Sequence, residues 1–250
     1  MNQLDLDLVI EYIRTNIRPQ YHEKKLNRIK TLRLEDIIKR KNPYLFRAKG
    51  MNSAHEFISS VMEAALSSGE ETSFGNFLEG VAIFVAQNVH SGRKSGIIGI
   101  DLEFEQDANK YLVAIKSGPN WGNSSQIKSL INAFSTAKRT LATSGGNRGK
   151  NLICVEACCY GRDDIPDKGT HLKICGQRFW ELVSGGNSEL YRQIIEPLGN
   201  NAKDRSEEVE ELSAEKLNIF TAEFVLRFCD TGAINWDRLI QFNSGKEFRS

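Results

Sequence analysis

The stretch Gly99–Gly118, GIDLEFEQDANKYLVAIKSG, decides the fold expected for this chain. Apolar and polar residues alternate over residues 100–105 and again over 111–116, and a short polar segment separates the two runs. Alternation with a period of two on both sides of a turn predicts a β-hairpin. The turn is expected to centre on residues 107–110.

Two carboxylates and one ammonium are expected on one face of this hairpin. In the register set by that turn, Asp101 lies opposite Lys116 and Glu103 lies opposite Ala114. Carboxylate oxygens suit Mg²⁺, which lowers the pKa of a bound water and polarises a phosphoryl oxygen. A nearby lysine can orient the attacking water or stabilise charge on phosphorus. The same pattern is also typical of the solvated polar face of an amphipathic hairpin.

Length and composition are those of an ordinary globular protein. The chain has 250 residues, of which 40% are hydrophobic and 26% are charged, as in a typical single domain. No stretch approaches the roughly 18 apolar residues of a membrane span, and the N-terminus is too polar for a secretory signal. The five cysteines form no CxxC pair, which predicts buried thiols in a reducing compartment. The four histidines are scattered and suggest neither a zinc site nor a Ser/His/Asp arrangement. We therefore expect a cytoplasmic protein without a membrane partner.

Charge is unevenly distributed although the net charge is only +1. No acidic residue occurs between Asp107 and Glu156, and the first 60 residues are also basic, while acidic residues concentrate over 204–223. The basic residues of the acid-free span are Lys110, Lys116, Lys128, Lys138, Arg139, Arg148 and Lys150. A basic surface beside a metal–carboxylate cluster favours a phosphodiester substrate. Lysines on helices are, however, commonly only solvent-facing.

Hydrophobic periodicity predicts a mixed α/β order of elements. The expected helices and their ends are Leu4–Ile17 closed by Pro19, Leu26–Lys39 closed by Asn42-Pro43, Ser53–Leu66 capped by Ser53 and broken at 67–69, Phe74–Val89, Gln126–Leu141 capped by Ser124 or Ser125, Phe179–Val183, Leu190–Ile195 and about Arg205–Phe228. The expected strands beyond the hairpin are Asn151–Tyr160 and Thr170–Cys175, with loops over 91–96 and 118–123 and a polar linker over 143–150.

The hairpin resembles the metal-binding half of the PD-(D/E)xK nuclease core. More closely, long segments of the chain are similar to the type II restriction endonucleases of the PmeII family. These segments are KNPYLFRAKG (Lys41–Gly50), LSSGEETSFGNFLEGVAIFVA (Leu66–Ala86), GIDLEF (Gly99–Phe104), IKSGPNWGNSSQ (Ile115–Gln126) and IQFNSG (Ile240–Gly245). The similarity covers nearly the whole chain.

The resemblance implies a restriction-endonuclease-like α/β core, in which helices flank a mixed central β-sheet, with helical N- and C-terminal additions. It predicts a single nuclease domain over 1–250, with a helical part at about 1–65, a catalytic core at about 66–175 and a mostly helical part at about 176–250. The implied activity is Mg²⁺-dependent, sequence-specific hydrolysis of double-stranded DNA in a restriction–modification system. The implied partners are a second copy of the chain and a companion DNA methyltransferase that forms no stable complex with it.

The nuclease motif is matched at two positions and departs at a third. Asp101 fits the motif aspartate and Lys116 the motif lysine, but Ala114 stands where the pattern has Glu or Asp. Glu103, across the hairpin in the expected register, is the favoured replacement carboxylate. Glu79, on the preceding helix, is the second candidate, because a carboxylate in that apolar stretch needs a partner or a metal. A simple charge on the helix face is the structural alternative for Glu79.

The loop that follows the motif lysine is expected to contact DNA. Asn and Gln side chains can read adenine, Ser can pair with several base edges, and backbone amides at a helix start can bind phosphate. Alternatively, its glycines and proline only make turns and its tryptophan only covers the core. The candidate DNA-binding residues are Arg93, Lys94, Ser117, Asn120, Trp121, Asn123, Ser124, Ser125, Gln126 and Lys128.

Two other functions compete with the endonuclease reading. A catalytically impaired sequence-specific DNA-binding protein of the same fold is the alternative, because Ala114 interrupts the motif. A purely structural or interaction module is less favoured, since it does not explain an intact pair of Asp101 and Lys116.

Overall fold

The computed structural model describes residues 2–143, 149–199 and 202–246. The chain divides into two compact units, each built from two separate segments. The first unit comprises Met1–Arg18 and Phe74–Asn200, and the second comprises Pro19–Ser73 and Asn201–Ser250. The boundaries expected at about 65 and 175 stay predictions. A single nuclease domain over 1–250 stays a prediction.

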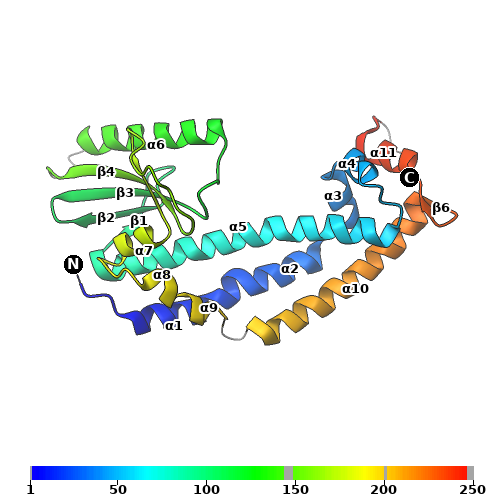
Figure 1. Cartoon of the computed structure of the whole chain (residues 1–250), viewed down its shortest axis with the longest axis horizontal. Helices are drawn as coiled ribbons and strands as arrows, with labels where there is room; N and C mark the ends of the chain where they lie inside the picture. The colour runs from blue at the N-terminus through cyan, green and yellow to red at the C-terminus, as the bar shows by residue number, and fades with distance from the viewer. Residues whose placement is uncertain (1, 144–148, 200–201, 247–250) are drawn as a thin grey trace. The chain divides into compact units, whose positions relative to one another are not determined.

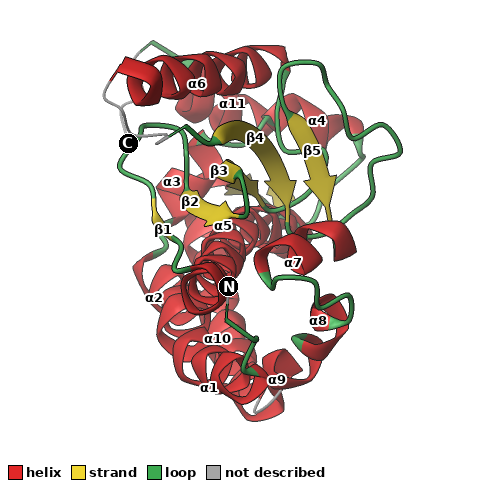
Figure 2. Cartoon of the chain, turned by 90° about the vertical axis from the view of Figure 1, so that its left-hand side faces the viewer, coloured by secondary structure: helices red, strands yellow, loops and turns green. Residues whose placement is uncertain are grey.

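A five-stranded mixed sheet forms the centre of the first unit, in the order β1-β2-β3-β4-β5 (Figure 2). The strands are β1 (Arg93–Lys94), β2 (Leu102–Gln106), β3 (Asn109–Lys116), β4 (Asn151–Cys158) and β5 (Leu172–Cys175). Strand β2 is antiparallel to its neighbours β1 and β3, whereas β3, β4 and β5 are parallel to one another. The expected mixed α/β fold class is confirmed. The loop expected over 91–96 contains a strand, since β1 pairs with β2 at the edge of the sheet.

The predicted hairpin is confirmed, but its predicted register was wrong by two residues. Leu102 pairs with Val113 and Glu103 pairs with Leu112, so Asp101 lies level with Ala114. The turn contains only Asp107 and Ala108, and Asp107 adopts a φ of 54°, which aspartate tolerates better than most residues. A slip of two residues leaves every side chain on its predicted face.

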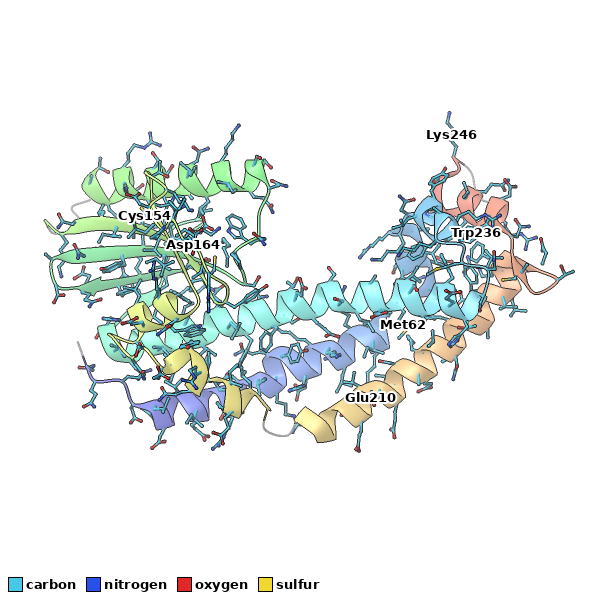
Figure 3. All side chains as sticks on the ribbon, in the orientation of Figure 1. Met62, Cys154, Asp164, Glu210, Trp236 and Lys246 are labelled. Carbon is cyan, nitrogen blue, oxygen red and sulfur yellow. The ribbon has the colours of Figure 1, made fainter. Side chains whose placement is uncertain are left out.

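Helix α6 (Ser124–Thr143) connects β3 to β4 and lies along one face of the sheet (Figure 1). Its apolar residues pack on that face in a cluster that includes Leu112, Ala114, Phe134 and Cys154, the last of which is labelled in Figure 3. The opposite face is contacted by helix α5 (Ala54–His90), where the His90 ring stacks on Phe104 with centroids 4.7 Å apart. Because β3, β4 and β5 are parallel, their carboxyl ends lie at the same end of the sheet.

The remaining helices of the first unit are short. They are α1 (Leu6–Ile17), α7 (Gln177–Val183), α8 (Leu190–Gln193) and α9 (Ile195–Gly199). The expected strands and helices of this part are confirmed within a few residues, except that Phe74 lies inside α5 rather than at the start of a helix. The linker expected over 143–150 lies outside the described residues at 144–148, and so does Arg148. No helix in the described part of the chain is long and apolar enough to cross a membrane.

The second unit is mainly helical. Its elements beyond its part of α5 are α2 (Glu23–Thr31), α3 (Leu34–Lys39), α4 (Pro43–Ala48), α10 (Ala202–Phe228), α11 (Trp236–Ser244) and the two-stranded β6 (Cys229–Asp230) and β7 (Ala233–Ile234). The core brings together aromatic rings from α5 and α10, with the Phe57 and Phe224 centroids 5.0 Å apart. Met62, labelled in Figure 3, belongs to the same core cluster, and Trp236, also labelled there, packs against it.

Several expectations for the helices were wrong, among them the break at 67–69, because α5 runs without interruption through Ala54–His90. Pro19 does not end the first helix, because the π-helix η1 (Arg18–His22) continues it with a wider turn that accommodates a residue lacking an N–H donor. The helix expected over Leu26–Lys39 is interrupted at Leu32 and Arg33, which are extended. Asn42-Pro43 begins α4 rather than ending a helix, since the Asn42 side chain accepts hydrogen bonds from the first turn and Pro43 lies at its start.

Candidate active site

Asp101 and Lys116 meet at one end of the hairpin. The Lys116 ammonium lies 3.9 Å from Asp101 Oδ2, and both side chains are about a quarter exposed. The same Oδ2 accepts a hydrogen bond of 2.7 Å from the Ile115 N–H, which fixes the carboxylate against β3. Asp101 and Lys116 are therefore in contact as the sequence predicted. The two residues are not directly opposite each other on the hairpin but lie diagonally.

Trp121 lies against this pair. The Lys116 ammonium is 5.0 Å from the centroid of the Trp121 ring, a distance at which a cation is attracted to an aromatic face. The indole Nε1–H donates a hydrogen bond of 2.8 Å to Glu156 Oε1. The DNA contact expected for Trp121 stays a prediction, and the structure shows that its ring links Lys116 to a buried carboxylate.

Glu156 is the residue of this region that the sequence analysis did not single out. It lies on β4 in register with Ala114, and only 4% of it is exposed. His171 Nε2 lies 3.1 Å from its Oε2, and Lys173 Nζ lies 2.9 Å from its Oε1. Burial alone would raise the pKa of Glu156, but hydrogen bonds from His171, Trp121 and Lys173 outweigh it and lower the pKa to about 2. A signal was available, because one glutamate stands in the apolar run NLICVEACCY.

Glu103 lies in a closed set of ion pairs. Its carboxylate accepts a hydrogen bond of 2.7 Å from Ser95 Oγ and pairs with Lys110 at 3.3 Å and Arg93 at 3.4 Å. Burial would raise the pKa of Glu103, but the Ser95 hydrogen bond and the Lys110 charge lower it. The observed register places Glu103 opposite Leu112 rather than Ala114, so its carboxylate does not lie directly across from the position where the motif lacks one.

Glu79 lies on α5 and pairs with the ammonium of Lys94 at 3.4 Å. Its own side chain is 22% exposed and that of Lys94 is 72% exposed. Burial, followed by the charge of Glu79, raises the pKa of the Cys159 thiol to about 12, and the Cys159 N–H donates to the Lys116 carbonyl at 3.0 Å. Glu79 therefore acts on Cys159, whose backbone is hydrogen-bonded to that of Lys116.

The loop after Lys116 is held partly by its own side chains. The cap of α6 is Asn123 and not Ser124 or Ser125 as expected: its Oδ1 accepts from the Ser125 and Gln126 N–H groups at 3.1 Å. Gln126 Oε1 in return accepts from the Asn123 N–H at 2.9 Å, which completes a capping box. The remaining expected DNA contacts on this loop and helix are exposed, namely Ser117, Asn120, Ser124 and Lys128.

The oxygen donors at this site are compatible with a divalent cation but do not form a complete shell. Asp101 is half-buried and uses only its Oδ2 in a hydrogen bond to the backbone. Over the described ranges, no group of three or more His, Cys, Asp or Glu side chains is arranged to hold a metal ion. Mg²⁺ usually binds one or two carboxylates and completes its octahedral shell with waters and substrate phosphate, so one such carboxylate fits that chemistry.

The family model of the type II restriction endonuclease EcoO109I matches residues 7–206. The match covers most of the chain, and the chain belongs to this family. No curated protein matches the sequence. The class predicted from the sequence is confirmed, and the matching family model is that of EcoO109I, so the finer resemblance to the PmeII enzymes stays a prediction.

Membership in this family makes the protein a site-specific deoxyribonuclease of a restriction–modification system, which cleaves DNA at a specific sequence. Its substrate is DNA, and enzymes of this family typically use a divalent metal. The matched residues include the complete five-stranded sheet and both Asp101 and Lys116.

Proposed function

We propose that the enzyme hydrolyses double-stranded DNA with Mg²⁺ as its cofactor and with Asp101 and Lys116 at the centre of the active site. The observation that carries this proposal is the contact of 3.9 Å between Lys116 Nζ and Asp101 Oδ2 at the end of the hairpin. A bound Mg²⁺ supplies a water of lowered pKa and neutralises phosphate charge. Asp101 would hold the ion, while Lys116 would donate to the attacking water or to a phosphate oxygen.

Glu79 is the second carboxylate that we favour, ahead of Glu103. Its ion-pair partner Lys94 is mostly exposed. Because an ion pair with an exposed partner contributes little free energy, Glu79 can exchange Lys94 for a metal ion at little cost. If Glu103 moved to bind a metal ion, it would instead separate from Lys110, which is only 6% exposed. Breaking such a buried ion pair is strongly unfavourable. We retain Glu103 as the alternative ligand.

The DNA contacts are proposed to divide between phosphate and base recognition. Exposed Lys128 and the other basic residues of α6 are suited to phosphates. Asn120 is the amide side chain of the loop best placed to reach a base, because Asn123 and Gln126 are engaged in the capping box. Arg93 and Lys94, whose side chains are 74% and 72% exposed, are further candidates for phosphate contacts.

The biological setting is also a proposal. A homodimer acting beside a separate companion methyltransferase fits a restriction–modification system, and kinship with the PmeII enzymes fits the long motifs of the sequence. The five cysteines are free and four are buried, which supports a reducing, cytoplasmic location. The alternative function is that of a catalytically impaired DNA-binding protein, and the following test distinguishes it from an active nuclease.

The test compares cleavage with binding. Asp101→Ala and Lys116→Ala should each lower the rate of Mg²⁺-dependent cleavage of phage DNA by roughly a hundredfold or more, while both variants still bind DNA in Ca²⁺. Glu79→Ala should be as inactive as Asp101→Ala, and Glu103→Ala should be less impaired. Mapping the fragment ends produced by the wild type gives the recognition sequence and the cut position.

The matched control lies on the same hairpin. Glu105 and Lys150 form an ion pair of 2.9 Å, and Glu105→Ala should leave the cleavage rate unchanged. Cleavage within tenfold of wild type in Asp101→Ala or Lys116→Ala contradicts the assignment. A wild-type protein that binds DNA specifically and never cleaves it supports the impaired alternative.

A further inference from the structure

A buried carboxylate lies beside the position where the nuclease motif lacks one. Residues paired on neighbouring strands share a face, so Ala114 on β3 and Glu156 on β4 lie side by side, and Asp101, directly before β2, continues this row on the other side of Ala114. The middle member has no functional side chain. Glu156 cannot simply replace it as a metal ligand, because its two oxygens already accept from Trp121, Lys173 and His171.

The partners of Glu156 connect it to the loop that carries Trp121. Besides its contact with Glu156, Lys173 Nζ donates a hydrogen bond of 2.8 Å to the Pro119 carbonyl. Glu156 thus binds the indole directly and, through Lys173, the backbone two residues earlier. Gly118 allows the loop to approach closely, since a Cβ there would overlap the Tyr160 ring. The loop is therefore anchored at several points next to Lys116.

The orientation of the indole decides what it offers to the ammonium. An aromatic ring attracts a cation over its face but not at its edge. The bond of 2.8 Å from Nε1 to Glu156 fixes the ring with its face 5.0 Å from Lys116 Nζ. Lys116 consequently has two restraints, the ring on one side and Asp101 Oδ2 at 3.9 Å.

We propose that Glu156 is a positioning residue that orients Lys116 through Trp121; this inference rests on the proposed catalytic role of Lys116. Glu156 itself touches neither substrate nor metal in this arrangement. Its effect belongs to the chemical step, because a misplaced ammonium lowers the stabilisation of the transition state while leaving most DNA contacts intact.

The experiment measures single-turnover cleavage with saturating enzyme and Mg²⁺, and separately measures the affinity for the cognate site in Ca²⁺. Trp121→Leu, which removes the ring, should lower the cleavage rate by about three- to thirtyfold, the factor that corresponds to a cation–π contact. Trp121→Phe keeps a ring but lacks the Nε1–H donor, so it should lower the rate by a smaller factor. Neither change should alter the affinity in Ca²⁺ by more than about twofold.

Glu156→Gln tests the buried end of the same connection. It keeps an oxygen that can accept from the indole N–H but loses the charge that strengthens this hydrogen bond, so it should lower the rate by less than Trp121→Phe. It should have no further effect when combined with Trp121→Phe, because residues that act as one unit are not additive. The Trp121 variants keep the proposal testable if Glu156→Gln does not fold, since Trp121 is only half-buried. Trp236→Phe is the control, because Trp236 also faces a cation, with Arg47 5.5 Å away, in the second unit.

Three results would overturn the proposal. Cleavage at the wild-type rate in Trp121→Leu would show that the ring does not position Lys116, and an equal loss of rate and affinity would make Trp121 a DNA contact. Loss of Mg²⁺ binding in Glu156→Gln would make Glu156 a metal ligand. The proposed function fails by a different result, namely an active Lys116→Ala variant, so the two failures are distinguishable.

Discussion

Glu156 and Glu103 are both almost fully buried, and hydrogen-bond donors keep both of them ionised. For Glu156, burial opposes the charge, yet His171, Trp121 and Lys173 lower its pKa from 4.5 to about 2. A carboxyl whose pKa is lower in the folded than in the unfolded state stabilises the fold above its unfolded pKa. That stabilisation is lost as the pH falls from about 4.5 toward the folded value.

Acid should therefore destabilise the wild type more than Glu156→Gln. Between pH 5 and pH 3 the free energy of unfolding should fall by about 2 kcal/mol more in the wild type, as the lowered pKa requires. Urea titrations at several pH values measure this difference. Glu189→Gln serves as the control, because the Glu189 carboxylate is about half exposed beside Arg192 and should leave the pH dependence unchanged. Parallel curves for wild type and Glu156→Gln would contradict the prediction.

At the scale of elements, helix α5 continues through a segment whose sequence predicts a break. Ser67-Ser68-Gly69 predicts a break, yet α5 runs without interruption through Ala54–His90. Arg28 on α2 lies against Gly69 and donates from Nη2 to the Ala65 carbonyl at 2.8 Å. A Cβ at residue 69 would overlap the Arg28 guanidinium, so the glycine makes room for a contact between two helices.

This contact makes the effect of Gly69→Ala dependent on Arg28. Alanine favours a helix interior over glycine by about 1 kcal/mol, but in the wild-type background this gain is offset by displacement of the Arg28 hydrogen bond, which is worth a similar amount. Gly69→Ala should therefore be nearly neutral alone and should stabilise by about 1 kcal/mol in an Arg28→Ala background. Urea denaturation of the four proteins measures the coupling. Equal effects of Gly69→Ala in both backgrounds would argue against the contact.

At the scale of the whole molecule, the residues assigned to cleavage all belong to the first unit, and that unit holds one pair of Asp101 and Lys116. One such site per chain cuts one strand at a time. A homodimer presents two sites related by two-fold symmetry, which suits both a double-strand cut and a palindromic target.

A mixed dimer should therefore nick DNA. Wild-type and Asp101→Ala chains carrying different affinity tags are co-expressed, and the species bearing both tags is purified. This species should convert a supercoiled plasmid with one recognition site to the open circle, whereas a doubly tagged wild-type dimer should linearise it. Gel electrophoresis separates the three plasmid forms. Linearisation by the mixed species at the wild-type rate, or failure to recover any chain pair, would contradict the homodimer.

Local pattern predicted much of the first unit. The alternation around residues 107–110, the apolar run of β4 and the periodicity of α6 specify their elements because each depends on nearest neighbours in the sequence. Ser53 was also predicted as a cap, and its Oγ accepts from the Glu56 N–H at 3.5 Å. The hairpin register escaped prediction, since a slip of two residues preserves the same alternation; a two-residue turn with Asp107 at positive φ decided it.

The sequence by itself determined the class of the protein, four of the five strands of the sheet, and the presence of an aspartate and a lysine on one face of a hairpin. Only the tertiary structure decided what surrounds that pair. Glu156 lies on β4 and Lys173 on β5, and His171 directly precedes β5. Trp121 lies on the loop after β3 and donates its hydrogen bond to Glu156. Contacts of this kind depend on which strands become neighbours, and the packing of the whole sheet, rather than any local pattern, settles that order.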